Sequence, residues 1–154
     1  MQLHESLVDR DSWSAQGACP VEAAVRVIGS RASMLIIREA YYGTRRFDEF
    51  VSRVAMAPAT ASAHLSALVD AGLLERHRYR EQGARAREDY RLTQAGRDLV
   101  PVVLGLFQWG RRHTAVKPPA DLVHVGCGES VTVSVQCGAG HHIALEDIEL
   151  RPVP

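Results

Sequence analysis

Arginine residues concentrate in a short stretch near the middle of the chain. Five guanidinium groups fall within twelve residues, at positions 76, 78, 80, 85 and 87. Guanidinium pairs well with phosphate because its planar fork of N–H donors matches the phosphate oxygens. The whole chain has no net charge, yet residues 19–117 hold 16 basic and 10 acidic side chains. This excess predicts a polyanionic partner, and a solvated arginine-rich surface is the alternative.

Thiols and imidazoles provide a second kind of chemistry. Cys19 directly precedes Pro20 at a predicted helix start, where the helix dipole and free backbone N–H groups favour a thiolate. Because a thiolate is oxidised more readily than a thiol, Cys19 is a candidate redox sensor. The alternative is a small capping residue packed in an interface.

A pattern of possible metal ligands lies near the C-terminus. Its spacing is H-x2-C-x9-C-x3-H, formed by His124, Cys127, Cys137 and His141. Thiolate and imidazole are the ligands of tetrahedral zinc, and two ligand pairs on turns could stabilise a small β element. The sequence therefore allows zinc in this segment, and the alternative is that these side chains pack without metal.

Hydrophobic periodicity predicts the elements that position these groups. Apolar residues recur at helical spacing in four segments, 20–28, 30–43, 48–54 and 58–72. Residues 45–47 are expected to form a very short strand. Two further strands, 74–79 and 88–92, flank a polar segment and predict a hairpin with a cationic tip. Thr93 caps a long final helix with a broad apolar face.

This order of elements predicts an α+β fold, a winged helix-turn-helix. Three parts are expected: an N-terminal extension at 1–18, the winged helix-turn-helix domain at 19–117, and a small β-rich C-terminal appendage at 118–154. No apolar run approaches the roughly 20 residues that a membrane span requires. The N-terminus also lacks the pattern of an export signal. A cytoplasmic protein with no membrane partner is therefore expected.

The predicted fold assigns DNA-contacting roles to particular residues. The second helix of a helix-turn-helix enters the major groove, and the exposed face of helix 58–72 offers Thr60, Ser62 and His64. This face lacks the Arg, Asn and Gln that make strong bidentate contacts with bases. Most of the affinity is therefore expected from phosphate contacts before the third helix and at the hairpin tip. The residues assigned to these contacts are Arg45, Arg46, Arg80, Arg85 and Arg87.

Several segments carry a family resemblance. The chain contains, in order, CPVEAAVRVIGSRASMLIIREAYYGTRRFDEF, LVDAGLLERHRY, DYRLTQAGRDLVPVV and FQWGRRH. Over residues 19–113 it resembles HxlR-type winged-helix transcriptional regulators of the MarR-like group. The resemblance implies a homodimer on a pseudo-palindromic operator in double-stranded DNA. It also implies oxidant or electrophile sensing by a cysteine near position 19.

The same resemblance places the first and last helices at the dimer interface, and the last helix is then a dimerisation helix. The residues implied at this interface are Val21, Val25, Leu99, Val103, Leu106, Phe107 and Trp109. The alternative for this apolar face is packing within one subunit.

Two departures from the family pattern affect these expectations. Ala32 occupies a position where the family usually has tryptophan, which implies a repacked core or, alternatively, a small-ligand pocket. His64 stands in the place of a usual arginine, while Ala59 and Ala63 replace polar residues. Direct readout of bases is therefore expected to be weaker than is usual in the family.

The leading hypothesis is a sequence-specific DNA-binding transcriptional regulator, modulated by thiol oxidation, electrophiles or a small ligand. The alternative is a winged-helix module that no longer binds DNA and acts as a protein-interaction or ligand-sensing partner. An enzyme is not expected, because the chain has no nucleophile elbow, phosphate loop or paired-carboxylate motif. No cofactor is expected apart from the possible zinc.

Overall fold

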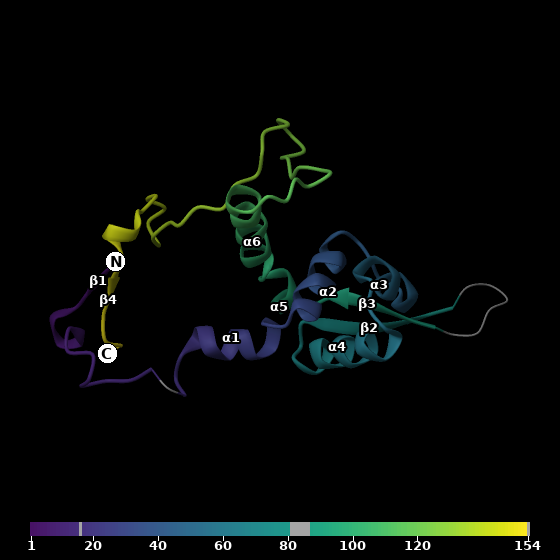
Figure 1. Ribbon diagram of the computed structural model, residues 1–154, viewed down its shortest axis with the longest axis horizontal. Helices are drawn as coiled ribbons and strands as arrows, with labels where there is room; N and C mark the ends of the chain where they lie inside the picture. Colours follow the sequence, from purple (N-terminus) through teal and green to yellow (C-terminus); the bar gives the residue numbers. More distant parts are fainter. Residues whose placement is uncertain (16, 81–86, 154) are drawn as a thin grey trace. The chain divides into compact units, whose positions relative to one another are not determined.

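The computed structural model describes residues 1–15, 17–80 and 87–153 (Figure 1). The chain divides into two units: Pro20–Thr114, and a second unit made of Met1–Cys19 together with Ala115–Pro154. Among the described residues, no helix combines the length and apolar character needed to cross a membrane.

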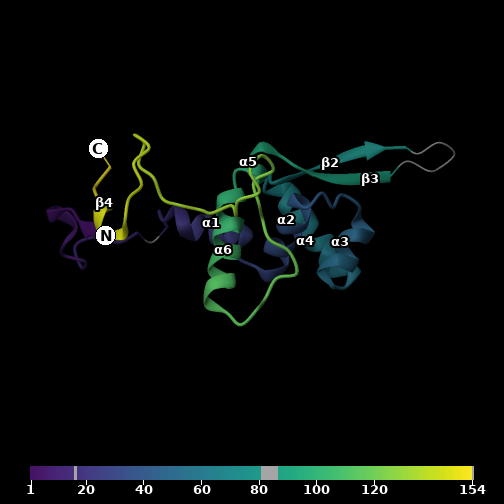
Figure 2. The same ribbon diagram turned by 90° about the horizontal axis from the view of Figure 1, so that it is seen from above.

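The unit Pro20–Thr114 has the predicted winged helix-turn-helix order. Its helices are α1 (Pro20–Ile28), α2 (Arg31–Tyr41), α3 (Phe47–Val54), α4 (Pro58–Asp70), α5 (Gln94–Arg97) and α6 (Val100–His113). Strands β2 (Leu74–Tyr79) and β3 (Arg87–Leu92) form an antiparallel hairpin, in which Leu74 pairs with Leu92 and Tyr79 with Arg87. Figure 2 shows this hairpin along one side of helices α2, α3 and α4.

Helix α2 is the centre of the core, as its apolar sequence predicts. Ile36 and Ile37 are both fully buried, and α2 contacts α1, α3, α4, α6 and β3. Each fully buried side chain of this size contributes about 1.5–3 kcal/mol through the hydrophobic effect. Ser30 begins the helix by accepting a hydrogen bond from the backbone N–H of Ser33.

The helix-turn-helix itself consists of α3 and α4. Ala55 adopts a left-handed conformation at φ 52° and ends α3. Pro58 occupies the first turn of α4, where its missing N–H costs no hydrogen bond. Ala61, Leu65 and Leu68 of α4 are buried, as predicted.

Two predictions about the elements were wrong. The expected strand at 45–47 does not form, because Phe47 is already the first residue of α3. The backbone N–H of Tyr90 donates to the Arg45 carbonyl at 2.9 Å, but no strand results. The single helix expected after Thr93 is divided into α5 and α6. Pro101 explains the division, since it has no N–H to donate and its ring would collide with the Arg97 carbonyl in a continuous helix.

The root of the hairpin is tied closely to α2. Thr93 caps α5 by accepting a hydrogen bond from the Gly96 backbone N–H, and the Tyr41 hydroxyl of α2 donates to the Gly96 carbonyl. A Cβ atom on Gly96 would lie 2.2 Å from the Leu73 carbonyl oxygen, so only glycine fits there. Burial and the charge of Asp98 raise the pKa of Tyr41 to about 12, which keeps its hydroxyl a hydrogen-bond donor.

The second unit joins the two ends of the chain. Strand β1 (Gln2–Leu3) pairs in parallel with β4 (Glu149–Leu150). The segment between residues 118 and 148 contains isolated bridges, Val123 with Ser130 and Gln136 with His142, in place of longer strands. Regular β structure is therefore sparser here than the alternating sequence predicts, since left-handed turns at Gly128 and Gly140 interrupt it.

Candidate nucleic-acid interface

Helix α4 presents small and polar side chains to solvent. Thr60 and Ser62 are exposed on it, next to exposed alanines at 59, 63 and 67. His64, which was expected on the exposed face of this helix, is half-buried, and its Nδ1 lies 3.2 Å from the Ser33 hydroxyl of α2. The exposed face can approach a DNA groove closely, but it offers few groups for base readout.

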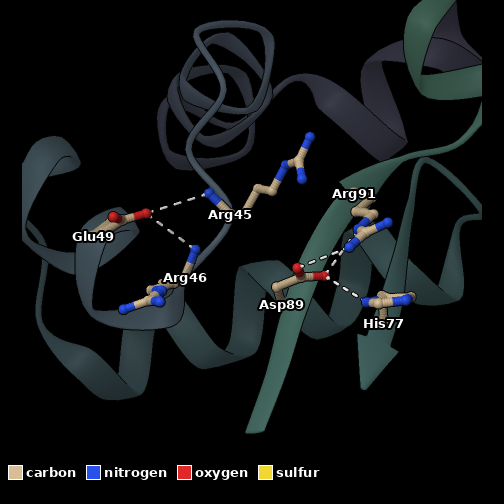
Figure 3. Close-up of polar contacts among 6 residues, drawn as sticks. All are labelled: Arg45, Arg46, Glu49, His77, Asp89 and Arg91. Atoms are coloured by element: carbon tan, nitrogen blue, oxygen red, sulfur yellow. Dashed lines mark hydrogen bonds and ion pairs between the residues drawn. The ribbon is translucent and has the colours of Figure 1, made fainter. Parts of the chain in front are cut away.

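A cleft opens between the α2–α3 loop and the hairpin. Its volume is about 410 Å³, and it is lined by Gly43, Arg45, Arg46, Glu49, Tyr79, Asp89 and Arg91. Figure 3 shows six polar residues at and beside this cleft. Three of its lining residues are arginines and two are acids, so the lining carries a positive excess.

Glu49 holds the loop that carries two of these arginines. Its carboxylate accepts hydrogen bonds from the backbone N–H groups of Arg46, at 3.2 Å, and Arg45, at 3.5 Å. The Arg45 and Arg46 side chains extend in different directions from this fixed backbone (Figure 3). The Arg46 guanidinium lies 5.7 Å from the centre of the Tyr79 ring. The loop therefore presents cations from a backbone that is anchored to α3.

Asp89 organises the opposite wall of the cleft. It is 7% exposed and accepts two hydrogen bonds from the Arg91 guanidinium, at 3.1 and 3.2 Å. His77, its partner across the hairpin, places Nδ1 3.5 Å from the same carboxylate. The bidentate pair of Arg91 and Asp89 satisfies a buried charge in the middle of the hairpin (Figure 3).

Glu49, Asp89 and Arg91 belong to this region although the sequence did not predict them there. The D-x-R spacing was an available signal for one pair, since residues two apart on a strand share a face. No local pattern indicates that Glu49 and Tyr79 border the same cleft, because they belong to elements that meet only in the fold.

The structure distributes the predicted phosphate-contacting residues over two places. Arg45 and Arg46 lie at the cleft and are exposed. Arg80 follows β2 and Arg87 begins β3, and both are exposed near the end of the hairpin. Arg85 lies outside the described residues.

The predicted interface residues of α1 and α6 divide into two groups. Four are exposed apolar side chains: Val21 (70%), Val25 (57%), Leu106 (55%) and Trp109 (61%). Leu99 and Val103 instead pack partly against the core cluster, and Phe107 is half-buried. The exposed group leaves apolar surface on both helices.

The three cysteines are free thiols with different surroundings. Cys19 is half-buried directly before α1, while Cys127 is exposed with Sγ 3.2 Å from His124 Nδ1. Backbone N–H groups of Ala139 and His141 lower the pKa of the Cys137 thiol. Cys137 is thus the thiol for which hydrogen bonding favours the thiolate.

The four candidate zinc ligands do not form one cluster. His124 contacts Cys127, whereas Cys137 is joined to His141 through its backbone N–H, at 3.0 Å from the His141 carbonyl. Within the described ranges, no three His, Cys, Asp or Glu side chains are grouped so that they could hold a metal ion. This arrangement does not fit a tetrahedral site.

Comparisons with known proteins agree with the winged helix-turn-helix architecture. The family model for the HxlR-like helix-turn-helix matches residues 27–118. An uncharacterized HTH-type transcriptional regulator of Mycobacterium tuberculosis, Rv3095, is 35% identical over 137 residues, which cover 87% of this chain and 85% of the relative.

Solved structures show the same similarity. PA1607, a protein of known crystal structure, is 32% identical in sequence to this chain. The match covers 89% of this chain and 96% of PA1607, with a TM-score of 0.78. The redox regulator HypR in its oxidized form is 29% identical, covers 64% of this chain and 100% of that chain, and has a TM-score of 0.57.

Removal of Arg91 is expected to destabilise the hairpin, because Asp89 would keep a buried charge without its bidentate partner. Arg91→Ala should lower the free energy of unfolding by about 1–3 kcal/mol, measured by urea denaturation. Arg78→Ala is the matched control: its ion pair with Glu88 involves an Arg78 side chain that is 85% exposed. That variant should lose less than about 0.5 kcal/mol. Equal losses in the two variants would contradict a structural role for the Asp89–Arg91 pair.

Proposed function

The chain belongs to the HxlR-like helix-turn-helix family and is therefore a DNA-binding transcriptional regulator, not an enzyme, and we propose that it acts as a homodimer on a pseudo-palindromic operator. One observation carries the proposal: α4 exposes small and polar residues, while exposed arginines stand on the neighbouring loop and hairpin. Small side chains permit close approach to DNA, and guanidinium groups bind its phosphates.

Phosphate contacts supply most of the affinity in this proposal. Arg45 and Arg46 extend from the loop anchored by Glu49, and Arg80 and Arg87 lie at the described ends of the hairpin strands. Thr60 and Ser62 provide hydroxyl groups toward the groove. Since these make weaker base contacts than Arg or Asn, discrimination between sequences depends partly on the spacing of two half-sites.

The dimer supplies that spacing. Apolar side chains of α1 and α6 are exposed in the single chain, with Val21 and Trp109 among the most exposed at 70% and 61%. Burial of such surface favours association. Two recognition helices related by a twofold axis then meet half-sites about 34 Å apart, and a small change at the interface alters this distance.

Thiol oxidation is the proposed regulatory input, with a small ligand as the alternative effector. HypR is described as a redox regulator and has a similar fold at 29% identity. Cys19 directly precedes α1, one of the two helices proposed for the dimer interface. Oxidation there would change the chemistry at the start of this helix and hence the spacing of the recognition helices.

The cationic contacts can be tested through the salt dependence of DNA binding. Arg45→Ala and Arg87→Ala should each weaken binding to every duplex and reduce the slope of log K against log salt by about 1. Anisotropy titrations with a duplex from the region upstream of the chain's own gene measure both quantities. Arg151→Ala, which removes an exposed tail cation paired with Glu149, is the control. Unchanged slopes for both test variants would contradict the phosphate contacts of Arg45 and Arg87, whereas a wild-type protein that binds no duplex would favour a winged-helix module that acts without DNA.

The dimer can be tested by placing charge on the exposed apolar faces. Val25→Glu and Leu106→Glu should produce monomers, because a carboxylate would be buried without a partner in the interface. Light scattering after size-exclusion chromatography measures the mass. Val125→Glu provides a control at a tail valine that is 101% exposed. A wild-type monomer, or variants that remain dimeric, would refute the proposed interface.

The thiol proposal predicts a different role for each cysteine. Diamide should lower the DNA affinity of the wild-type protein but not that of Cys19→Ser. Cys137, whose thiol pKa is lowered, should react with iodoacetamide at a lower pH than an ordinary thiol, while Cys137→Ser keeps the diamide response of DNA binding. Loss of that response in Cys137→Ser, with retention in Cys19→Ser, would place the sensor in the tail.

A further inference from the structure

A chain of hydrogen bonds links the start of α2 to the recognition helix α4. Ser30 Oγ accepts from the Ser33 backbone N–H at 2.9 Å, and the Ser30 hydroxyl lies 2.8 Å from Ser33 Oγ. Ser33 Oγ in turn lies 3.2 Å from His64 Nδ1. Ser33 is 4% exposed, so water has little access to the middle of this chain.

The geometry gives the chain a direction. The Ser30 hydroxyl donates to Ser33 Oγ. A serine hydroxyl carries a single hydrogen, and that of Ser33 is therefore available to His64 Nδ1. A neutral imidazole has one donor nitrogen and one acceptor nitrogen. If Nδ1 accepts from Ser33, then the proton of the ring is on Nε2.

The other ring nitrogen, Nε2, is the candidate donor to a ligand. In the part of the chain that the structure describes, no protein group is bonded to His64 Nε2. His64 is half-buried on α4, one helical turn after the exposed Thr60, so the two residues lie on the same side of the helix.

We propose that Ser33 is a positioning residue that holds His64 as its Nε2–H tautomer, so that α4 presents one fixed N–H donor to a hydrogen-bond acceptor on DNA. The acceptor is a phosphate oxygen or a purine N7 or guanine O6 atom, which share this chemistry. The DNA contact rests on the proposed function above, whereas the tautomer is a property of the free protein.

The hydrogen-bond chain also explains how a residue in this position can act. A free imidazole rotates and exchanges between tautomers, whereas Ser33 restricts both for His64. Less conformational freedom is then lost on binding. The contact is that of a neutral donor, in contrast to the charged arginines of the loop and hairpin.

The tautomer is tested on the free protein by the nitrogen chemical shifts of the His64 ring, at a pH where the ring is neutral. Wild-type protein should show one Nε2–H tautomer, and Ser33→Ala should show shifts averaged between the two tautomers. Alanine keeps the backbone N–H bond to Ser30 and suits a helix interior. Ser66→Ala, at a half-buried serine of α4, is the control with unchanged shifts. An Nδ1–H tautomer in the wild type, or no change in Ser33→Ala, would overturn the proposal.

The DNA contact is tested with a duplex that the wild-type protein enriches from a random pool. His64→Ala should bind it about five- to tenfold more weakly, the size of one neutral hydrogen bond, and His64→Gln should recover part of the loss. Ser33→Ala alone should weaken binding relative to the wild type. The same substitution added to His64→Ala should cause no further loss, because the two residues act together.

Two further binding measurements distinguish a base acceptor from a phosphate acceptor. A loss confined to the enriched duplex indicates a base, and 7-deazapurines reproduce it if the acceptor is N7 but not if it is guanine O6, whereas an equal loss on a scrambled duplex indicates a phosphate. Full affinity of His64→Ala for both duplexes would overturn the donor role. If the wild type binds neither duplex, the proposed function fails, and the ring shifts of the free protein still decide the tautomer.

Discussion

Burial of helix α2 is the constraint on which the rest of the main unit depends. Ile36 and Ile37 are adjacent in sequence and both are 0% exposed, so neighbouring elements must cover this helix on more than one side. Helices α3 and α4 cover it together with strand β3. The recognition helix, the loop and the hairpin root therefore have positions set by the same core, which lets them act as one rigid surface.

Charge is divided between structural and exposed roles around this core. Arg91 is committed to the buried Asp89, and Glu49 is committed to the backbone of the loop. These two acids stabilise the walls of the cleft, whereas Arg45, Arg80 and Arg87 remain exposed. A few exposed arginines on a fixed backbone thus hold the net positive charge of residues 19–117. This arrangement favours phosphate binding.

Proline and glycine decide the shape near the last helices. Pro101 separates α5 from α6, and Gly96 allows α5 to approach the Leu73 carbonyl. The short helix α5 is held at the hairpin root by the hydrogen bonds that Thr93 and Tyr41 make with Gly96. Helix α6 then begins anew with its own apolar face, part of which packs on the core while Leu106 and Trp109 stay exposed.

The amino-acid sequence by itself determined the order of elements and the inward face of α4, because helical periodicity, capping residues and turn residues act over a few positions. It also located the exposed arginines. Only the tertiary structure decided which polar groups meet: Ser33 and His64 are 31 residues apart, and Tyr41 and Gly96 are 55 apart. It likewise separated the four candidate zinc ligands and divided the last helix. Such outcomes depend on packing between distant segments, which no local pattern encodes.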